Sequence, residues 1–103
     1  MSGGAPLSAY IKDALSVCFS VPVFEAYATT ETAGSLCITN YWEREAGVVG
    51  GPMSCMKIRL NDLTELGYLS TNEPYPQGEV VLKGNNVFKG YFKDPVLTDQ
   101  AFD

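Results

Sequence analysis

The residues Tyr27-Ala28-Thr29-Thr30-Glu31 place an aromatic ring, two hydroxyls and a carboxylate directly after an apolar run that predicts a buried strand. A Thr hydroxyl can donate to a phosphate oxygen, a Glu carboxylate is a hard ligand for magnesium, and the ring offers a flat face to a base. The same residues also suit a helix cap, in which Thr29 or Thr30 caps a turn and Glu31 lies at the positive end of the dipole. The residues alone leave both interpretations open.

A glycine-rich segment precedes this motif, at residues 2–8. Ser2-Gly3-Gly4-Ala5-Pro6-Leu7-Ser8 carries small residues that would bring free backbone amides close to a nucleotide. The alternative is an ordinary capped start of a helix, because short glycine loops are common there. The choice between the two depends on what lies nearby in the fold.

Residues 8–19 show the spacing of an amphipathic helix, with Ser8 as the predicted N-cap and Pro22 marking its end. Lys12 and Asp13 are expected on the wet face. Cys18 is expected in the core rather than as a nucleophile, because no base is available to activate its thiol. The predicted apolar stripe consists of Leu7, Ile11, Leu15 (or Ala14), Cys18 and Phe19.

The rest of the chain predicts short strands joined by turns. The M-K-I-R-L alternation over 56–60 is the pattern of a strand with one dry face. A helix is expected from Pro95, with Thr98 as its candidate cap. Further strands are expected at 23–27, 36–41 and 78–84, a turn at 47–52 and a loop at 61–77.

Composition excludes several classes of function. The chain has 103 residues, 7 Lys plus Arg and 12 Asp plus Glu, so its net charge of −5 disfavours binding to nucleic acid. There is no His, which excludes Ser-His-Asp and Cys-His centres within the chain. No run approaches the roughly 20 apolar residues of a membrane span. Lys83, Lys89 and Lys93 predict a solvated face rather than a binding patch.

Cysteine use points to a reducing compartment. Cys18, Cys37 and Cys55 are odd in number and form no C-x-x-C pair, so neither a zinc site nor a disulfide framework is predicted. We therefore expect an intracellular protein, in the cytoplasm or on the cytoplasmic face of an internal membrane.

Four motifs resemble, in order and spacing, the central part of an adenylate-forming, AMP-binding enzyme. A further likeness, in Leu66–Leu69 and Pro74–Glu79, is to the eukaryotic long-chain fatty acyl-CoA synthetases. The resemblance implies an α/β fold that is a fragment of the large N-terminal domain: a nucleotide-binding sheet with helices over 1–46, then the start of a β-rich subdomain over 47–103. The four motifs are Ser2–Ser8, Tyr27–Thr32, Gly47–Pro52, and Gly78–Glu79 together with Gly84–Pro95.

The resemblance also implies a function in fatty acid and lipid metabolism. Such an enzyme joins a long-chain fatty acid to AMP from ATP, releases pyrophosphate, and then exchanges AMP for the thiol of coenzyme A, with Mg²⁺ as cofactor. Thr30 and Glu31 are the implied catalytic residues, and Glu31 is the implied metal ligand. The implied nucleotide-binding residues are Gly3, Gly4, Ala5, Pro6, Tyr27, Ala28, Thr29 and Thr30.

Two departures from the family pattern keep alternatives open. Ala28 stands where the family usually has glycine, which is expected to slow or alter catalysis. A phosphate loop, a ribose-binding Asp and a catalytic Lys are expected outside this segment, so the segment alone is predicted to be inactive and to need the rest of its parent chain. The alternatives are a catalytically incomplete nucleotide-binding or interaction module, and a ligase for another carboxylic acid.

Overall fold

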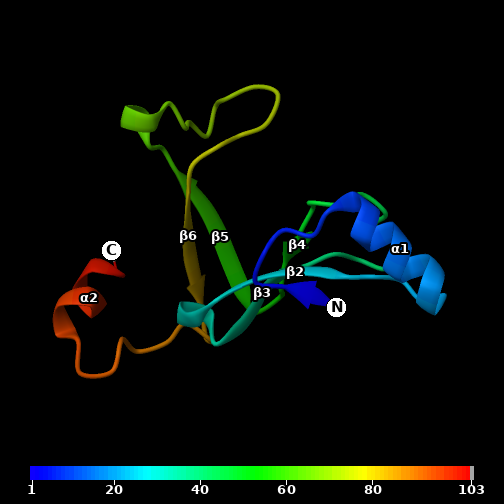
Figure 1. The fold of residues 1–103 in the computed structure, drawn as a ribbon. Helices are drawn as coiled ribbons and strands as arrows, with labels where there is room; N and C mark the ends of the chain where they lie inside the picture. The colour runs from blue at the N-terminus through cyan, green and yellow to red at the C-terminus, as the bar shows by residue number, and fades with distance from the viewer. Residues whose placement is uncertain (103) are drawn as a thin grey trace.

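Two β-sheets form the frame of the computed structural model, which describes residues 1–102 (Figure 1). The first sheet has the strand order β1 (Ser2–Gly3), β2 (Glu25–Thr29), β3 (Gly34–Ile38) and β4 (Gly51–Pro52). β1 pairs with β2 in parallel, and the other pairs are antiparallel. This sheet therefore brings the N-terminal glycine loop beside the strand that precedes Glu31.

The second sheet is an antiparallel hairpin of β5 (Met56–Asn61) and β6 (Glu79–Gly84). Met56 is buried and Lys57 is exposed, which confirms the predicted alternation. The hairpin leaves the first sheet at an angle, and the loop between its strands, which contains a short 3₁₀ helix at Thr64–Leu66, projects from its far end (Figure 1).

Helix α1 (Ala9–Phe19) begins as predicted, because the Ser8 hydroxyl oxygen accepts a hydrogen bond from the Ile11 amide at 3.4 Å. The prediction of its buried face is only partly right, because Asp13 is exposed and Leu15 is half-buried as expected, but other positions differ. Lys12 is buried with 4% exposed, whereas Phe19 is 68% exposed. The expected core residue Cys18 is exposed. The reason is electrostatic: the β2 residue that faces the helix is an acid, so the helix turns its one lysine inward.

The strands on either side of the Glu31 turn lie two residues away from their predicted starts. The strand expected over 23–27 is β2 (Glu25–Thr29), and that expected over 36–41 is β3 (Gly34–Ile38). Tyr27 pairs with Cys37, and the register shifts by a bulge between Tyr27 and Ala28. Thr29 therefore belongs to the sheet, as the last residue of β2.

Helix α2 (Pro95–Gln100) begins at the predicted proline but with a different cap. The Asp94 carboxylate accepts a hydrogen bond from the Leu97 amide at 2.9 Å, so Thr98 is not the cap. The Thr98 hydroxyl instead lies inside the helix and donates to the Asp94 carbonyl at 2.7 Å. Neither helix of the described residues is long and apolar enough to cross a membrane.

The core is small and lies where the two sheets meet. Leu36, Cys37 and Met56 are buried there, with Ile58 and Leu82 packed against them. Burial raises the pKa of the Cys37 thiol. The radius of gyration is 16.0 Å, whereas a compact chain of about 100 residues has about 13 Å. The described residues therefore form an elongated frame.

Candidate active site

A 3₁₀ turn, η1 (Thr30–Thr32), carries Glu31 at the end of β2. Thr32 builds this turn: it is fully buried, and its hydroxyl lies 3.3 Å from the Thr29 amide and 2.8 Å from the Gly34 carbonyl. Thr29 occupies the N-cap position and Glu31 lies in the first turn, so the helix-cap interpretation holds for Thr29 and Glu31, and Thr32 completes the capping box. Thr30 is exposed on the same turn, and its carbonyl accepts a hydrogen bond from the amide of the C-cap residue Ala33 at 3.2 Å.

The Glu31 carboxylate accepts a hydrogen bond from the Tyr91 hydroxyl. This bond lowers the pKa of Glu31, helped by the backbone amide of Glu31 and by Thr29, against a smaller opposing effect of burial. The same hydrogen bond raises the pKa of Tyr91, and burial and the negative charge of Glu31 raise it further. Glu31 is therefore ionised at neutral pH, as a ligand for a hard cation must be.

The segment 84–91 closes over the turn. The Asn86 side-chain amide donates to the Thr32 carbonyl at 2.7 Å, and the Phe88 amide donates to the Glu31 carbonyl at 2.8 Å. Within the described residues the Asn86 Oδ1 atom is buried without a partner. Neither Asn86 nor Tyr91 was predicted as a site residue. Both lie in the motif Gly84–Pro95, and that position is the one sequence signal that could have identified them.

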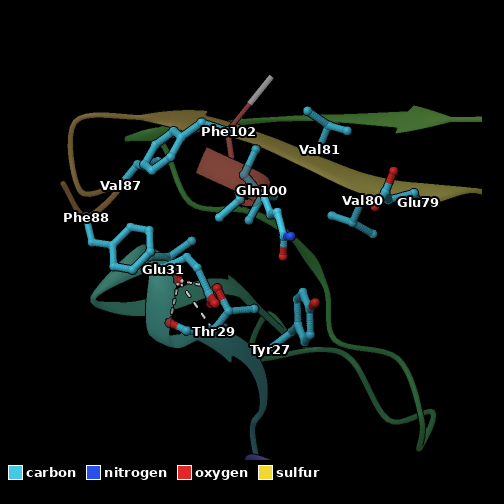
Figure 2. Close-up of a pocket in the computed structure, with 13 residues that line it drawn as sticks. Tyr27, Thr29, Glu31, Glu79, Val80, Val81, Val87, Phe88, Gln100 and Phe102 are labelled. Atoms are coloured by element: carbon cyan, nitrogen blue, oxygen red, sulfur yellow. Dashed lines mark hydrogen bonds between the residues drawn. The ribbon is translucent and has the colours of Figure 1, made fainter. Parts of the chain in front are cut away.

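A pocket of about 390 Å³ lies between this turn, β6 and the end of α2 (Figure 2). Tyr27, Thr29 and Glu31 line one side of it, and valines of β6 line another. The lining therefore combines acidic, hydroxyl and amide side chains with apolar ones. The labelled wall residues are Glu79, Val80, Val81, Val87, Phe88, Gln100 and Phe102.

A second pocket of about 270 Å³ also has Tyr27 in its lining, together with the glycine-rich loop. Tyr27 is 38% exposed and contributes to both pockets. The fold thus places the loop and the aromatic residue, far apart in sequence, at one cavity. The residues that line it are Ser2, Gly4, Ala5, Pro6, Glu25, Ala26, Tyr27, Ala28, Gly47 and Val49.

Two of the predicted site residues line neither pocket. Gly3 lies in β1 opposite Ala26, so closely that a Cβ at position 3 would come within 2.9 Å of the Ala26 carbonyl oxygen. This close approach is a reason for glycine there that is independent of any ligand. Thr30 lies beside Glu31 on the turn, with its side chain exposed.

Glu31 fits a magnesium ion only if phosphate oxygens and water supply the other ligands. Glu31 supplies one ionised carboxylate, and the described residues contain no group of three or more His, Cys, Asp or Glu that could hold a metal ion. Mg²⁺ in phosphate-transfer sites is commonly held by one or two carboxylates, substrate phosphates and water. Glu31 therefore suits a magnesium–nucleotide complex rather than a free-standing metal site.

Comparison with known proteins agrees with this arrangement. The family model described as "AMP-binding enzyme" matches residues 1–92. These residues include the glycine-rich loop, the Glu31 turn and Tyr91. The matched region contains every lining residue of the second pocket and all of those of the first pocket except Gln100, Ala101 and Phe102. The chain belongs to the AMP-binding enzyme family.

The relatives lie among long-chain acyl-CoA synthetases. The chain is 41% identical over 100 residues to fatty acyl-CoA synthetase A of Dictyostelium discoideum, covering 97% of this chain and 15% of that protein. It is 40% identical over 103 residues to long-chain-fatty-acid–CoA ligase 5 of Mus musculus, covering 100% of this chain and again 15% of the relative. The resemblance stated from the motifs is confirmed, and the chain spans about 15% of these relatives' length.

A solved structure confirms the predicted fold. The adenylation domain of a carboxylic acid reductase from Segniliparus rugosus, in complex with AMP and a co-purified carboxylic acid, matches 99% of this chain. The match covers 15% of that structure's chain, with 33% identity and a TM-score of 0.76. The fold is therefore the α/β fold of an adenylation domain, of which this chain forms a part.

Proposed function

We propose that this chain is the nucleotide-binding centre of a longer enzyme that activates a long-chain fatty acid with ATP. The acid forms acyl-AMP and pyrophosphate is released, and coenzyme A then displaces AMP to give acyl-CoA. The observation that supports this most is the convergence of the glycine-rich loop, Tyr27 and Glu31 on two adjoining pockets. The ligase names of the relatives supply the substrate class.

Each residue has a physical task in this proposal. The Tyr27 ring packs on the adenine, and the small residues Gly4 and Ala5 leave room for the base against their backbone. The ionised Glu31 carboxylate holds magnesium on the phosphates, and the exposed Thr30 hydroxyl donates to the α-phosphate. When bound, magnesium neutralises the charge that grows on the phosphate as the acid attacks. Thr32, buried behind them, keeps the turn rigid.

The proposal extends to location and to the whole protein. The three cysteines are unpaired in the structure, which supports an intracellular, reducing location in the cytoplasm or on the cytoplasmic face of an internal membrane. The 1–46 and 47–103 division stays a prediction. The rest of the parent chain is needed for turnover, because the pockets described are built from about 15% of a relative's length.

A second candidate, a ligase for another carboxylic acid, is favoured by one comparison. The adenylation domain that matches at a TM-score of 0.76 comes from a carboxylic acid reductase. A panel of acids of different chain length, tested for acid-dependent ATP–pyrophosphate exchange with the full-length parent, separates the two candidates. Exchange that rises with long-chain fatty acids supports the first, and exchange with short or aromatic acids alone supports the second.

The Glu31 turn provides the test of the chemistry. In the full-length parent, Glu31→Ala is expected to reduce fatty-acid-dependent ATP–pyrophosphate exchange by about 100-fold, comparable to removing one charge-stabilising group from an active site. Glu31→Gln keeps the shape but is a poorer ligand, so it should fall close to the alanine variant. Thr30→Val removes one hydrogen bond and should cost only about tenfold.

The control is Glu65→Ala, which removes an exposed carboxylate from the 3₁₀ helix of the projecting loop. Its exchange rate should equal that of the wild type. Near-normal exchange in Glu31→Ala would reduce this turn to a helix cap and contradict the proposal. Damage from Thr30→Val greater than from Glu31→Ala would contradict the assigned order.

A further inference from the structure

A buried ion pair connects α1 to the start of β2. The Lys12 ammonium lies 3.0 Å from the Glu25 carboxylate, and both side chains are only 5% exposed. The backbone of Glu25 is itself fixed, because its amide donates to the Thr39 hydroxyl at 3.0 Å and its carbonyl accepts from the Thr39 amide at 3.0 Å. The pair therefore sits on a rigid base.

Both members of the pair also bind the backbone of the loop that follows β3. The Lys12 ammonium donates to the Glu45 carbonyl at 2.6 Å, and the Glu25 carboxylate accepts from the Gly47 amide at 3.3 Å to each oxygen. The two charged groups thus hold the loop at the Glu45 carbonyl and at the Gly47 amide. Gly47 has a positive φ of 80°, so the backbone turns directly after the amide that the carboxylate holds.

The clamped loop forms part of the second pocket. Glu25, Gly47 and Val49 line that pocket together with the glycine-rich loop and Tyr27. A buried ion pair contributes little net stability, because the cost of desolvating two charges offsets their attraction, and apolar residues of the same size often stabilise as well or better. What the pair adds here is geometric, because its bonds to the Glu45 carbonyl and the Gly47 amide tie this part of the loop to α1 and β2.

We propose that Lys12 and Glu25 are positioning residues for the nucleotide pocket. Their ion pair holds Gly47 and Val49 where these residues wall the space between Tyr27 and the glycine-rich loop. Lys12 does not line this pocket, and the carboxylate of Glu25 is bonded to Lys12 and Gly47. The inference rests on the proposed function, since it assumes that this pocket receives the adenine part of ATP.

The test measures nucleotide binding in the full-length parent. Lys12→Met removes the charge at nearly constant length, and Glu25→Gln keeps the shape of the carboxylate. Each is expected to raise the Kd for AMP and the KM for ATP by about tenfold, because loss of a pocket wall weakens binding in ground and transition states alike. The kcat should stay within about twofold, and the KM for fatty acid should not change.

Hydrogen exchange supplies a second readout. The amides of residues 45–49 should exchange faster in both variants, whereas those of β5 and β6 should not. Lys83→Met is the matched control, because Lys83 is an exposed lysine on β6 outside the nucleotide pocket. It should leave both AMP binding and exchange unchanged.

If Lys12→Met does not fold, the double variant Lys12→Met/Glu25→Gln takes its place, because it leaves no buried charge uncompensated. Wild-type affinity for AMP in folded variants would overturn the inference, and so would loss of folding in every variant, which makes the pair a determinant of stability alone. Failure of the proposed function gives a different result: the unaltered parent itself would bind no AMP.

Discussion

Ala28 lines the second pocket, which we propose to bind the nucleotide. Ala28 lies in β2 just after the bulge, and its side chain is part of the pocket lining. Ala28→Gly should therefore widen the pocket and raise kcat/KM for ATP in the full-length parent by about two- to fivefold. The strand should lose roughly 0.5 to 1 kcal/mol of stability, because glycine has more backbone freedom in the unfolded chain. Unchanged or lower kcat/KM would show that the methyl group does not limit binding.

Gly50 is required by the backbone itself. Its φ is 76°, and a Cβ at this position would collide with the Ile38 carbonyl. Gly50→Ala should lower the free energy of unfolding by more than about 2 kcal/mol, since the strain of a left-handed residue alone is roughly 1 to 2 kcal/mol. Gly67 provides the control, because it has a similar φ of 72° but open space around its Cβ position.

Thermal unfolding of the full-length parent separates the two variants. Gly67→Ala should lower the melting temperature only through the strain of a positive φ. Gly50→Ala should lower it clearly more, because the added methyl group also collides with the Ile38 carbonyl. Equal shifts would mean that the β3–β4 connection relaxes around the added methyl group.

At the scale of elements, the chain shows what a sequence pattern can and cannot predict. The Ser8 cap and the strand at 56–60 follow from local chemistry and were correctly predicted. The burial of Lys12 on α1 was not, because its partners, the Glu25 carboxylate and the Glu45 carbonyl, lie 13 and 33 residues away. Periodicity treats lysine as a surface residue and has no term for such a partner.

The candidate site shows the same division. Tyr27 and Glu31 were identified because their functional groups are adjacent in sequence. Tyr91 was missed as a partner of Glu31, because 60 residues separate them and only the fold joins them. The placement of Gly4 and Ala5 at the same cavity as Tyr27 likewise depends on the parallel pairing of β1 with β2.

The segment 84–91 is held to the Glu31 turn by few bonds, so one substitution should loosen it. Asn86→Ala removes the 2.7 Å hydrogen bond from the Asn86 side-chain amide to the Thr32 carbonyl. The loss of about 1 kcal/mol or more corresponds to about fivefold more frequent local opening. Trypsin should therefore cut after the exposed Lys89 about fivefold faster in the full-length parent.

Asn85→Ala is the control for this experiment, because the neighbouring asparagine is exposed. Its cleavage rate after Lys89 should match the wild type. Equal rates for Asn85→Ala and Asn86→Ala would show that other contacts, such as the Phe88 amide to the Glu31 carbonyl, hold the segment alone.

At the scale of the whole molecule, apolar exposure limits stability. Phe19, Trp42 and Phe92 are 68%, 78% and 88% exposed, and the core contains only a few buried apolar side chains. Residues 1–103 on their own should therefore melt below about 45 °C, the lower edge for ordinary domains, and without a sharp transition. Circular dichroism on the isolated chain measures this. A cooperative melt above about 45 °C would contradict it.

The bond between Tyr91 and Glu31 also sets an order of events during synthesis. Because 60 residues separate the two side chains, a ribosome adding about 5 to 20 residues per second makes Tyr91 roughly 3 to 12 s after Glu31. Throughout that interval the nascent carboxylate has no phenol to hold it. The Glu31 turn is therefore synthesised before Tyr91, and the hydrogen bond between them forms only after the chain has grown past Tyr91.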